Sequence, residues 1–211
     1  MTTIQEQPEA KRPLRTILLV IGGLIIGIGF AWLLINWLIP PTYNGQVIDS
    51  KDPVTNFTLT GPGGESVSLV DFRDKVVILY FGYTFCPDVC PATMVELRTA
   101  MEELGRQADD VQVLMVSLDP ERDTPEVLEK YVAHFNPSFI GLTGTEDEVI
   151  AASAPLGIFY EKEEGSAASG YLVNHTATVM VLDKRGHLRL LYPFGTEGEA
   201  MAADLRHLTR D

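Results

Sequence analysis

Residues 75–91 read KVVILYFGYTFCPDVCP, an apolar run followed at once by two cysteines. Apart from its lysine, the run 75–82 is apolar, aromatic or glycine, which is typical of a strand buried on both faces of a sheet. A helical period begins after Pro91, so Cys86 and Cys90 fall on the turn between a strand and a helix. Open α/β sheets place their functional sites at this position, the carboxyl end of a central strand.

The segments on either side of this stretch alternate between strand and helix patterns. Before it, residues 56–60 and 65–69 alternate in polarity around a Gly-Pro-Gly-Gly turn, which predicts a β-hairpin. A short acidic stretch, residues 163–170, predicts a loop. After the cysteines the patterns predict a helix over 92–107, a strand over 111–118, a helix capped by Thr124 and opened by Pro125, a helix over 146–154, strands over 176–182 and 188–192, and a closing helix over 197–208.

The order of these elements predicts the fold class. A right-handed parallel β-α-β unit, followed by an antiparallel hairpin and a final helix, is the thioredoxin-like pattern. We therefore predict an α/β domain with a thioredoxin-like fold over residues 54–211, extended at its N-terminus by the β-hairpin. A doubly wound parallel sheet is the alternative. It requires a helix between the last two strands, and the turn at 183–186 leaves no room for one.

A second apolar run, residues 17–39, carries no charge. As a helix its 23 residues span roughly 35 Å, enough to cross a bilayer core of about 30 Å. Trp32 and Trp37 stand in its last third, where indole rings favour the headgroup region. The run predicts a single transmembrane helix before the α/β domain, with residues 40–53 as a tether between them.

Charges around this run predict its orientation. Three basic residues stand just before it: Lys11, Arg12 and Arg15. The first charge after it is Asp49, so the positive-inside rule puts residues 1–16 in the cytoplasm and everything after residue 39 outside. A cleaved signal peptide is the alternative. The run is longer than an h-region of about 7–15 residues, and no small-x-small cleavage site precedes Pro40, which disfavours that alternative.

Composition narrows the function classes. The chain has 211 residues, of which 45% are hydrophobic, so intrinsic disorder does not describe the whole of it. Its net charge of −13 repels phosphate, so nucleic acid is not a predicted partner. The acidic surface fits either simple solubility or a docking face for a basic partner. Two cysteines allow one disulfide, one soft-metal site or one redox pair.

The spacing of the cysteines favours chemistry over packing. A separation of four residues brings both sulfurs to one side of a helical turn. The helix N-terminus stabilises anions, so at least one of Cys86 and Cys90 is predicted to have a lowered pKa. A thiolate is both a redox nucleophile and a soft-metal ligand. Two unreactive core cysteines are the alternative, which fits a turn flanked by prolines poorly.

Three blocks resemble one family. Residues 86–91, Cys-Pro-Asp-Val-Cys-Pro, resemble the Cys-Pro-Asp-x-Cys-Pro signature of the Sco/SenC family, the membrane-anchored, thioredoxin-like copper proteins of cytochrome c oxidase assembly. Residues 117–125 are similar to its Asp-Pro-x-Arg-Asp-Thr block. Residues 171–176 resemble its Val-Asp-His segment, with Asn174 in place of the usual Asp. The resemblance covers about residues 54–208, together with the anchor.

This resemblance implies a copper site made of Cys86, Cys90 and His175, with one copper per chain. The fold agrees, because a strand from Thr176 that runs antiparallel to the cysteine-bearing strand brings His175 to the cysteine turn. Two thiolates and an imidazole suit Cu(I) and can serve Cu(II). Zinc accepts the same donors but requires a fourth ligand. Asn174 puts in doubt any charge that the family's Asp supplies beside the site.

The function that the resemblance implies is that of a metallochaperone, and thiol–disulfide reductase activity stays open beside it. It would sit in the inner (cytoplasmic) membrane with its soluble domain in the periplasm. There it would deliver copper to the binuclear site of cytochrome c oxidase subunit II, or reduce the cysteines of that site, and receive copper from a donor protein. The metal-independent alternative is a thiol–disulfide oxidoreductase that uses Cys86 and Cys90 as its redox pair. A weaker alternative is a peroxidase. Residues 83–86, Tyr-Thr-Phe-Cys, resemble a peroxidatic Thr-x-x-Cys site, but the threonine is one residue too close to the cysteine.

A few other residues have side chains that could take part in the copper site. Asp119 ends the second buried strand, so its carboxylate either reaches the copper region or serves as a turn residue before Pro120. Met94 follows Cys90 by four residues, and we predict that it belongs to the core rather than to the metal. No chemistry is assigned to the remaining histidines: His134, His187 and His207.

Overall fold

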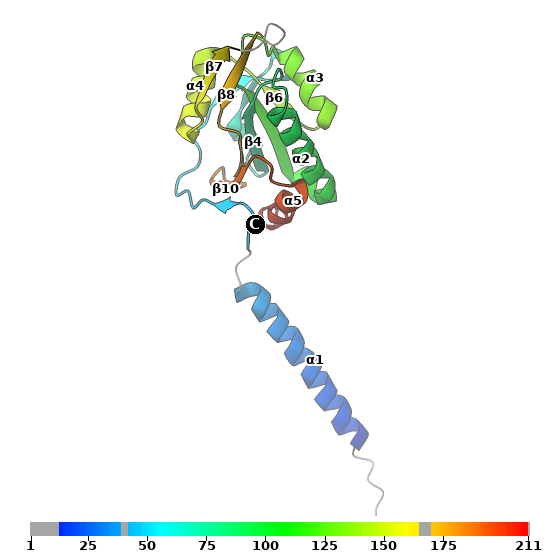
Figure 1. Ribbon diagram of the computed structural model, residues 1–211. Helices are drawn as coiled ribbons and strands as arrows, with labels where there is room; N and C mark the ends of the chain where they lie inside the picture. The colour runs from blue at the N-terminus through cyan, green and yellow to red at the C-terminus, as the bar shows by residue number, and fades with distance from the viewer. Residues whose placement is uncertain (1–12, 39–41, 165–169, 211) are drawn as a thin grey trace, which may run out of the picture. The chain divides into compact units, whose positions relative to one another are not determined.

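The computed structural model describes residues 13–38, 42–164 and 170–210, and the chain divides into two compact units, Met1–Thr42 and Tyr43–Asp211. The first unit contains helix α1, Pro13–Leu38 (Figure 1). Its stretch Thr16–Leu34 has a mean hydropathy of 2.7 and is a candidate transmembrane span by length and composition. The N-terminal tail to residue 12, with Lys11 and Arg12, and the prolines at 40 and 41 lie outside the described residues.

A six-stranded sheet with the order β1-β10-β9-β4-β5-β6 forms the centre of the second unit. Strands β4, β5 and β6 run parallel, whereas β9 is antiparallel to β4, and β10 to β9. This arrangement confirms the thioredoxin-like prediction and excludes the doubly wound sheet. The strands are β1 (Gln46–Val47), β4 (Val76–Gly82), β5 (Val111–Ser117), β6 (Ile140–Leu142), β9 (Thr178–Leu182) and β10 (Leu188–Pro193).

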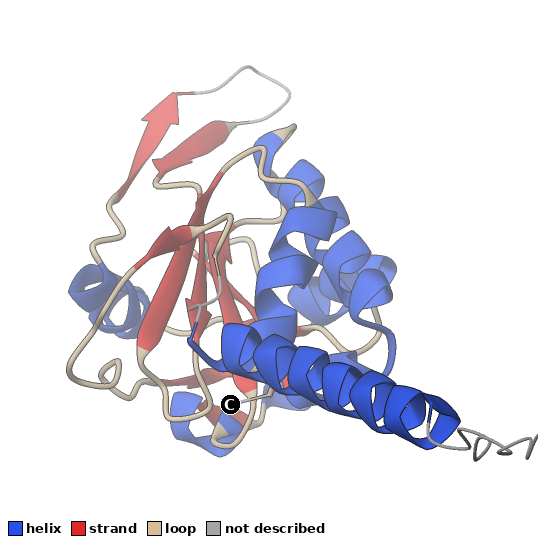
Figure 2. Cartoon of the chain, turned by 90° about the horizontal axis from the view of Figure 1, so that it is seen from below, coloured by secondary structure: helices blue, strands red, loops and turns tan. Residues whose placement is uncertain are grey.

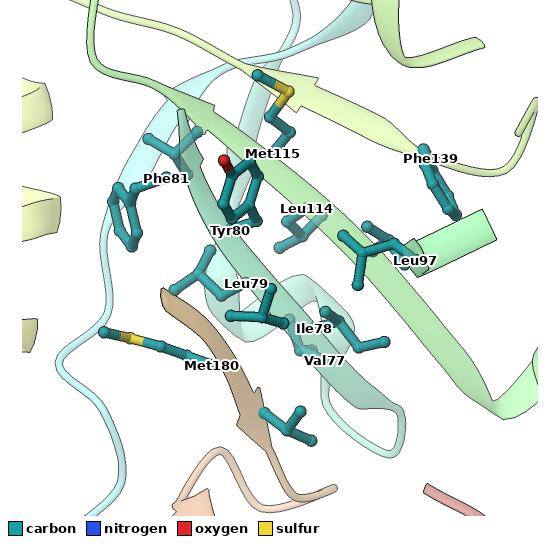
Figure 3. Close-up of a cluster of buried hydrophobic side chains, with 14 of the residues drawn as sticks. Val77, Ile78, Leu79, Tyr80, Phe81, Leu97, Leu114, Met115, Phe139 and Met180 are labelled. Atoms are coloured by element: carbon teal, nitrogen blue, oxygen red, sulfur yellow. The ribbon is translucent and has the colours of Figure 1, made fainter. Parts of the chain in front are cut away.

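The core lies on both faces of β4 and β5, whose residues are all buried, as expected of parallel strands covered on each side. Figure 3 shows the side chains of these strands packed with Leu97 and Met180. Met94 is completely buried in the same core, which confirms its predicted place.

Helices cover both sides of the sheet (Figure 2). Helix α2 packs against α3 and α5, whereas α4 packs against strand β2 (Thr58–Thr60) of the N-terminal hairpin. The Thr124 hydroxyl accepts a hydrogen bond from Val127 N at 3.4 Å, which confirms the predicted cap of α3. The α-helices are α2 (Val89–Leu104), α3 (Pro125–Phe135), α4 (Glu146–Ser153) and α5 (Gly198–Leu208), and short 3-10 helices cover Pro62–Gly64, Leu69–Phe72, Gly105–Asp110 and Ala154–Leu156.

Two hairpins stand outside this sheet. The predicted N-terminal hairpin is present as β2 (Thr58–Thr60) and β3 (Ser66–Ser68). A second hairpin, β7 (Tyr160–Glu164) with β8 (Tyr171–His175), was not predicted. The loop predicted from residue 163 begins inside β7, and its residues 165–169 lie outside the described residues. Strand β7 reads YEKEE and is mostly exposed, so it carries no alternation from which a strand could be predicted.

The predicted tether, residues 40–53, also needs correction. Its residues Gln46–Val47 form β1 and pair with β10, so the compact unit begins at Tyr43 rather than at residue 54. The buried carboxylate of Asp204 holds this entry by accepting hydrogen bonds from the backbone N–H groups of Asn44 and Gly45, each at 2.9 Å. These contacts come from the backbone N–H groups of an asparagine and a glycine, so hydrophobic periodicity gives no sign of them.

Candidate metal centre

The cysteine turn connects the end of β4 to the start of α2. Helix α2 begins at Val89, earlier than predicted, so Cys90 lies in its first turn and is completely buried, while Cys86 precedes the helix and is half-buried. The close approach depends on Gly82. A Cβ there would stand 2.8 Å from the Tyr80 ring and 3.1 Å from Cys90 Sγ. Glycine therefore lets the helix begin against the strand end.

The two free cysteines differ in their ionisation. A hydrogen bond from the Cys90 thiol is the main cause that lowers the pKa of Cys86 to about 5, and backbone N–H groups of Cys90 and Asp88 add to it. Cys90 N donates to Cys86 Sγ at 3.3 Å. The same thiol–thiolate hydrogen bond, together with burial, raises the pKa of Cys90. At neutral pH the pair is thus an accessible thiolate beside a buried thiol, which sharpens the prediction of one lowered thiol pKa.

His175 comes to this pair from the last position of β8. Its Nε2 lies 3.7 Å from Cys90 Sγ. Its Nδ1 lies 3.1 Å from the carbonyl oxygen of Thr176, which can only accept, so Nδ1 carries the proton and Nε2 presents a lone pair. Burial lowers the pKa of His175, which favours the neutral ring that binds metals. The Tyr83 ring and the imidazole form a T-shaped pair with centroids 6.0 Å apart.

The strand that carries His175 differs from the prediction. The histidine does not stand at the start of the strand beside β4, because that strand, β9, begins at Thr178. It ends the separate strand β8 instead, and residues 176–177 connect the two. The expected meeting of His175 with the cysteine turn is nevertheless present in the structure.

These donors fit a soft metal ion. Two ligands at bond lengths of about 2.3 Å (sulfur) and 2.0 Å (nitrogen) on one ion stand about 3.5–3.7 Å apart. The Cys90–His175 separation of 3.7 Å is of this size. Cys86 and His175 line one pocket of about 340 Å³. Among the described residues no three Cys, His, Asp or Glu side chains already converge as a complete site, so Cys86 would have to turn toward the other two on binding.

The other residues considered as site candidates have partners outside the cysteine pair or lie away from it. The buried Asp119 carboxylate pairs with Arg122 and accepts a hydrogen bond from Tyr171 Oη at 2.5 Å, so it serves the turn and not the sulfurs. Asn174 is exposed, and its Nδ2 donates to Glu163 Oε1 at 3.2 Å. The histidines at 134, 187 and 207 do not line the pocket.

Sequence reasoning missed one residue that supports the cysteine turn. The buried Asp123 carboxylate accepts hydrogen bonds from Thr84 N at 3.0 Å and Ser117 Oγ at 2.6 Å, which ties the turn to the end of β5. Burial raises the pKa of Asp123. Its only signal in the sequence was its place in the block 117–125, which the resemblance marked without giving it a role.

Comparison with known proteins identifies the class. Residues 46–210 match the SCO1/SenC family model, and the chain belongs to this family. A SCO2-like protein of Rickettsia felis is 30% identical over 190 residues, covering 87% of this chain and 93% of that protein.

Solved structures agree with this assignment. Apo Sco1 from Thermus thermophilus is 45% identical with a TM-score of 0.70, over 79% of this chain and 97% of that one. Arabidopsis thaliana ScoI with copper bound is 29% identical with a TM-score of 0.70, over 75% of this chain and 99% of that one. The family resemblance and the fold class predicted from the sequence are confirmed.

Proposed function

We propose that this chain is a membrane-anchored copper-binding protein of cytochrome c oxidase assembly. The observation that carries the proposal is the position of His175 Nε2, 3.7 Å from the sulfur of Cys90 and on one pocket with Cys86. The relatives support it. The Arabidopsis thaliana, Bradyrhizobium japonicum and yeast Sco structures were each solved with copper bound. A further Sco protein is described as a cytochrome c oxidase assembly protein.

Each proposed ligand has a distinct task. The Cys86 thiolate is exposed enough to meet incoming copper, which is cargo here, and its lowered pKa keeps it ionised. Cys90 is buried and protonated, so it gives up its proton as copper binds. His175 supplies Nε2 as a neutral third donor. Two thiolates suffice for Cu(I), and the imidazole extends the site to Cu(II), with one copper per chain.

Delivery requires a membrane anchor and two partners. We propose that the apolar run of α1 from residue 17 spans the inner membrane with residues 1–16 in the cytoplasm, which leaves the metal site in the periplasm. The cargo would come from a copper donor protein and pass to the binuclear site of oxidase subunit II. Cys86 is the more exposed of the two thiols, so an incoming thiol of the recipient would replace Cys86 before the buried Cys90.

Reduction of the recipient's cysteines is the second candidate, and the unequal thiols favour it. The Cys86 thiolate attacks a disulfide of the substrate and forms a mixed disulfide, releasing one substrate thiolate. Cys90 then loses its proton and attacks Cys86 Sγ, which releases the second substrate thiolate and leaves a Cys86–Cys90 disulfide. The substrate gains two electrons and the cysteine pair loses two. An external dithiol must then reduce the pair again.

Copper titration of the full chain in detergent, reduced and anaerobic, tests the leading proposal. We expect one copper per chain, and loss of binding in Cys86→Ser and Cys90→Ser, because a hydroxyl is a harder and far less acidic donor than a thiol. Oxidation of the pair to a disulfide should also abolish loading. His187→Ala, a half-buried histidine outside the pocket, is the control and should bind like the parent. Full loading of the oxidised chain would contradict the cysteine assignment.

Oxidase activity in cells separates delivery from reduction. A reductase needs Cys86 and Cys90 only, so His175→Ala should then still support oxidase assembly in part. Copper delivery needs the third ligand, and the same variant should fail at low copper. Near-normal oxidase activity of His175→Ala without added copper would reject delivery through this residue.

A further inference from the structure

The third proposed ligand stands on an element that is separate from the main sheet. Strands β7 and β8 pair with each other in their own two-stranded sheet, and β8 ends at His175. The cysteines instead belong to the junction of β4 and α2. Residues 176–177 connect β8 to β9, and contacts between the hairpin and the cysteine turn add to this connection in holding Cys90 and His175 3.7 Å apart.

Arg122 makes contacts on both sides of this division. Its guanidinium carbon lies 3.7 Å from the ring centroid of Tyr171, the first residue of β8, and its Nη1 donates to the Tyr171 carbonyl at 3.0 Å. On the other side it lies 4.7 Å from the ring centroid of Phe85 and 6.0 Å from that of Tyr83, both on the cysteine turn. One planar cation thus lies between aromatic rings of the two segments.

Arg122 is itself held in place by a buried carboxylate. It forms an ion pair with the completely buried carboxylate of Asp119 at the end of β5. The other carboxylate oxygen accepts the hydroxyl of Tyr171 at 2.5 Å. Asp119, Arg122 and Tyr171 therefore form a closed set of contacts that fixes the start of β8 to the central sheet. A second link joins the other strand, where Lys162 pairs with Glu121 at 2.8 Å.

We propose that Arg122 is a positioning residue for copper binding: it joins the cysteine turn to the β7–β8 hairpin and so sets the distance between Cys90 and His175. This inference rests on the proposed function. In this proposal the arginine is not a ligand and acts through His175. Its effect should fall mainly on Cu(II), which needs the imidazole, and less on Cu(I), which two thiolates can hold.

A double-mutant cycle with the full chain in detergent tests this proposal. We expect Arg122→Gln to weaken Cu(II) binding about 10–100-fold, as loss of an orienting contact commonly does, and to alter the Cu(II)–thiolate absorption. In the His175→Ala background the same change should have no further effect on copper affinity. Arg122→Lys keeps the charge beside Asp119 without the planar fork, and should restore part of the affinity. Arg98→Gln on the exposed face of α2 is the matched control, with unchanged binding.

Tyr171→Phe is a milder second variant in case Arg122→Gln does not fold. It removes the hydroxyl that donates to Asp119 and keeps the arginine that neutralises this carboxylate. It should weaken Cu(II) binding in the same direction. An equal loss from Arg122→Gln with and without His175 would show a general structural role and overturn the proposal.

Failure of the proposed function gives a different pattern, since the parent chain would then bind no copper. Hydrogen exchange of the metal-free chain still decides the inference in that case. Arg122→Gln should speed exchange in β8 while leaving β4 unchanged. Unchanged exchange in β8 would overturn it.

Discussion

The two halves of the proposed metal centre are built differently. The cysteine half belongs to the central strand β4 and the first turn of α2, where β4 is buried at every residue. The histidine half belongs to a hairpin whose strand β7 is largely exposed and charged. Among the described residues its two strands pair with each other and with no third strand. A site assembled from one deeply fixed half and one peripheral half can keep the buried Cys90 in place while Cys86 and His175 adjust. We infer that this division suits a protein that must both take up and release its metal.

The largest expected effect tests where stability resides. Phe81 in β4 is completely buried, and Phe81→Ala should lower the free energy of unfolding by about 3–5 kcal/mol. Leu172 in β8 is only half-buried, and Leu172→Ala should cost about 1–2 kcal/mol. Urea unfolding of the two variants with a common probe measures both. Equal losses would remove the distinction between the two halves.

Loss of the third ligand should affect binding without affecting folding. His175→Ala should weaken Cu(II) binding by more than about tenfold, roughly 1.4 kcal/mol, and abolish the Cu(II)–thiolate charge-transfer absorption. Cu(I) should bind more weakly but still bind through Cys86 and Cys90. The free energy of unfolding of the metal-free variant should stay within about 1 kcal/mol of the parent, because the histidine lies on the peripheral half. A Cu(II) spectrum identical to the parent's would remove His175 from the site.

The contrast between the halves also explains what could be predicted from the sequence. The apolar run 75–82 and the turn to α2 follow local rules of burial and capping, so the fold class and the cysteine half were predictable. The hairpin follows no such rule, since YEKEE neither alternates nor repeats. Its β8 strand starts at Tyr171, which Arg122 and Asp119 contact, and these contacts join residues about 50 positions apart. His175 was therefore assigned through resemblance and topology, while its strand was missed.

A pH experiment sharpens the difference between the two thiols. Because the pKa of Cys86 is lowered to about 5, its alkylation by iodoacetamide should be half-maximal near pH 5 and level off above it. Cys90 is buried with a raised pKa and should resist alkylation in the folded chain. A profile for Cys86 centred near the ordinary thiol pKa of about 8.5 would contradict this assignment.

The lowered pKa of Cys86 also predicts how the free energy of unfolding changes with pH. A lowered folded-state pKa contributes stability that is complete above the unfolded pKa of about 8.5 and is lost as pH falls toward about 5. Reduced chain should therefore lose this contribution on acidification, and Cys86→Ser should show a flatter dependence over that interval. Urea midpoints at several pH values measure it, and a parallel dependence in the two proteins would contradict the prediction.

The smallest expected effect concerns Asn174, where the family resemblance leads us to expect Asp. Asn174 donates to Glu163 and stands opposite Glu161 in the hairpin register, so Asn174→Asp would put a third carboxylate beside two others. Like charges across a strand pair should lower the free energy of unfolding by about 0.2–1 kcal/mol. The added negative charge next to His175 should also raise the histidine pKa and favour a bound cation, with a few-fold gain in copper affinity at low salt that screening removes. Asn174→Ala is the control, because it breaks the hydrogen bond to Glu163 without adding charge. Copper affinity measured at two ionic strengths separates the two variants, and a gain in Asn174→Ala equal to that in Asn174→Asp would show that the lost hydrogen bond, and not the charge, is responsible.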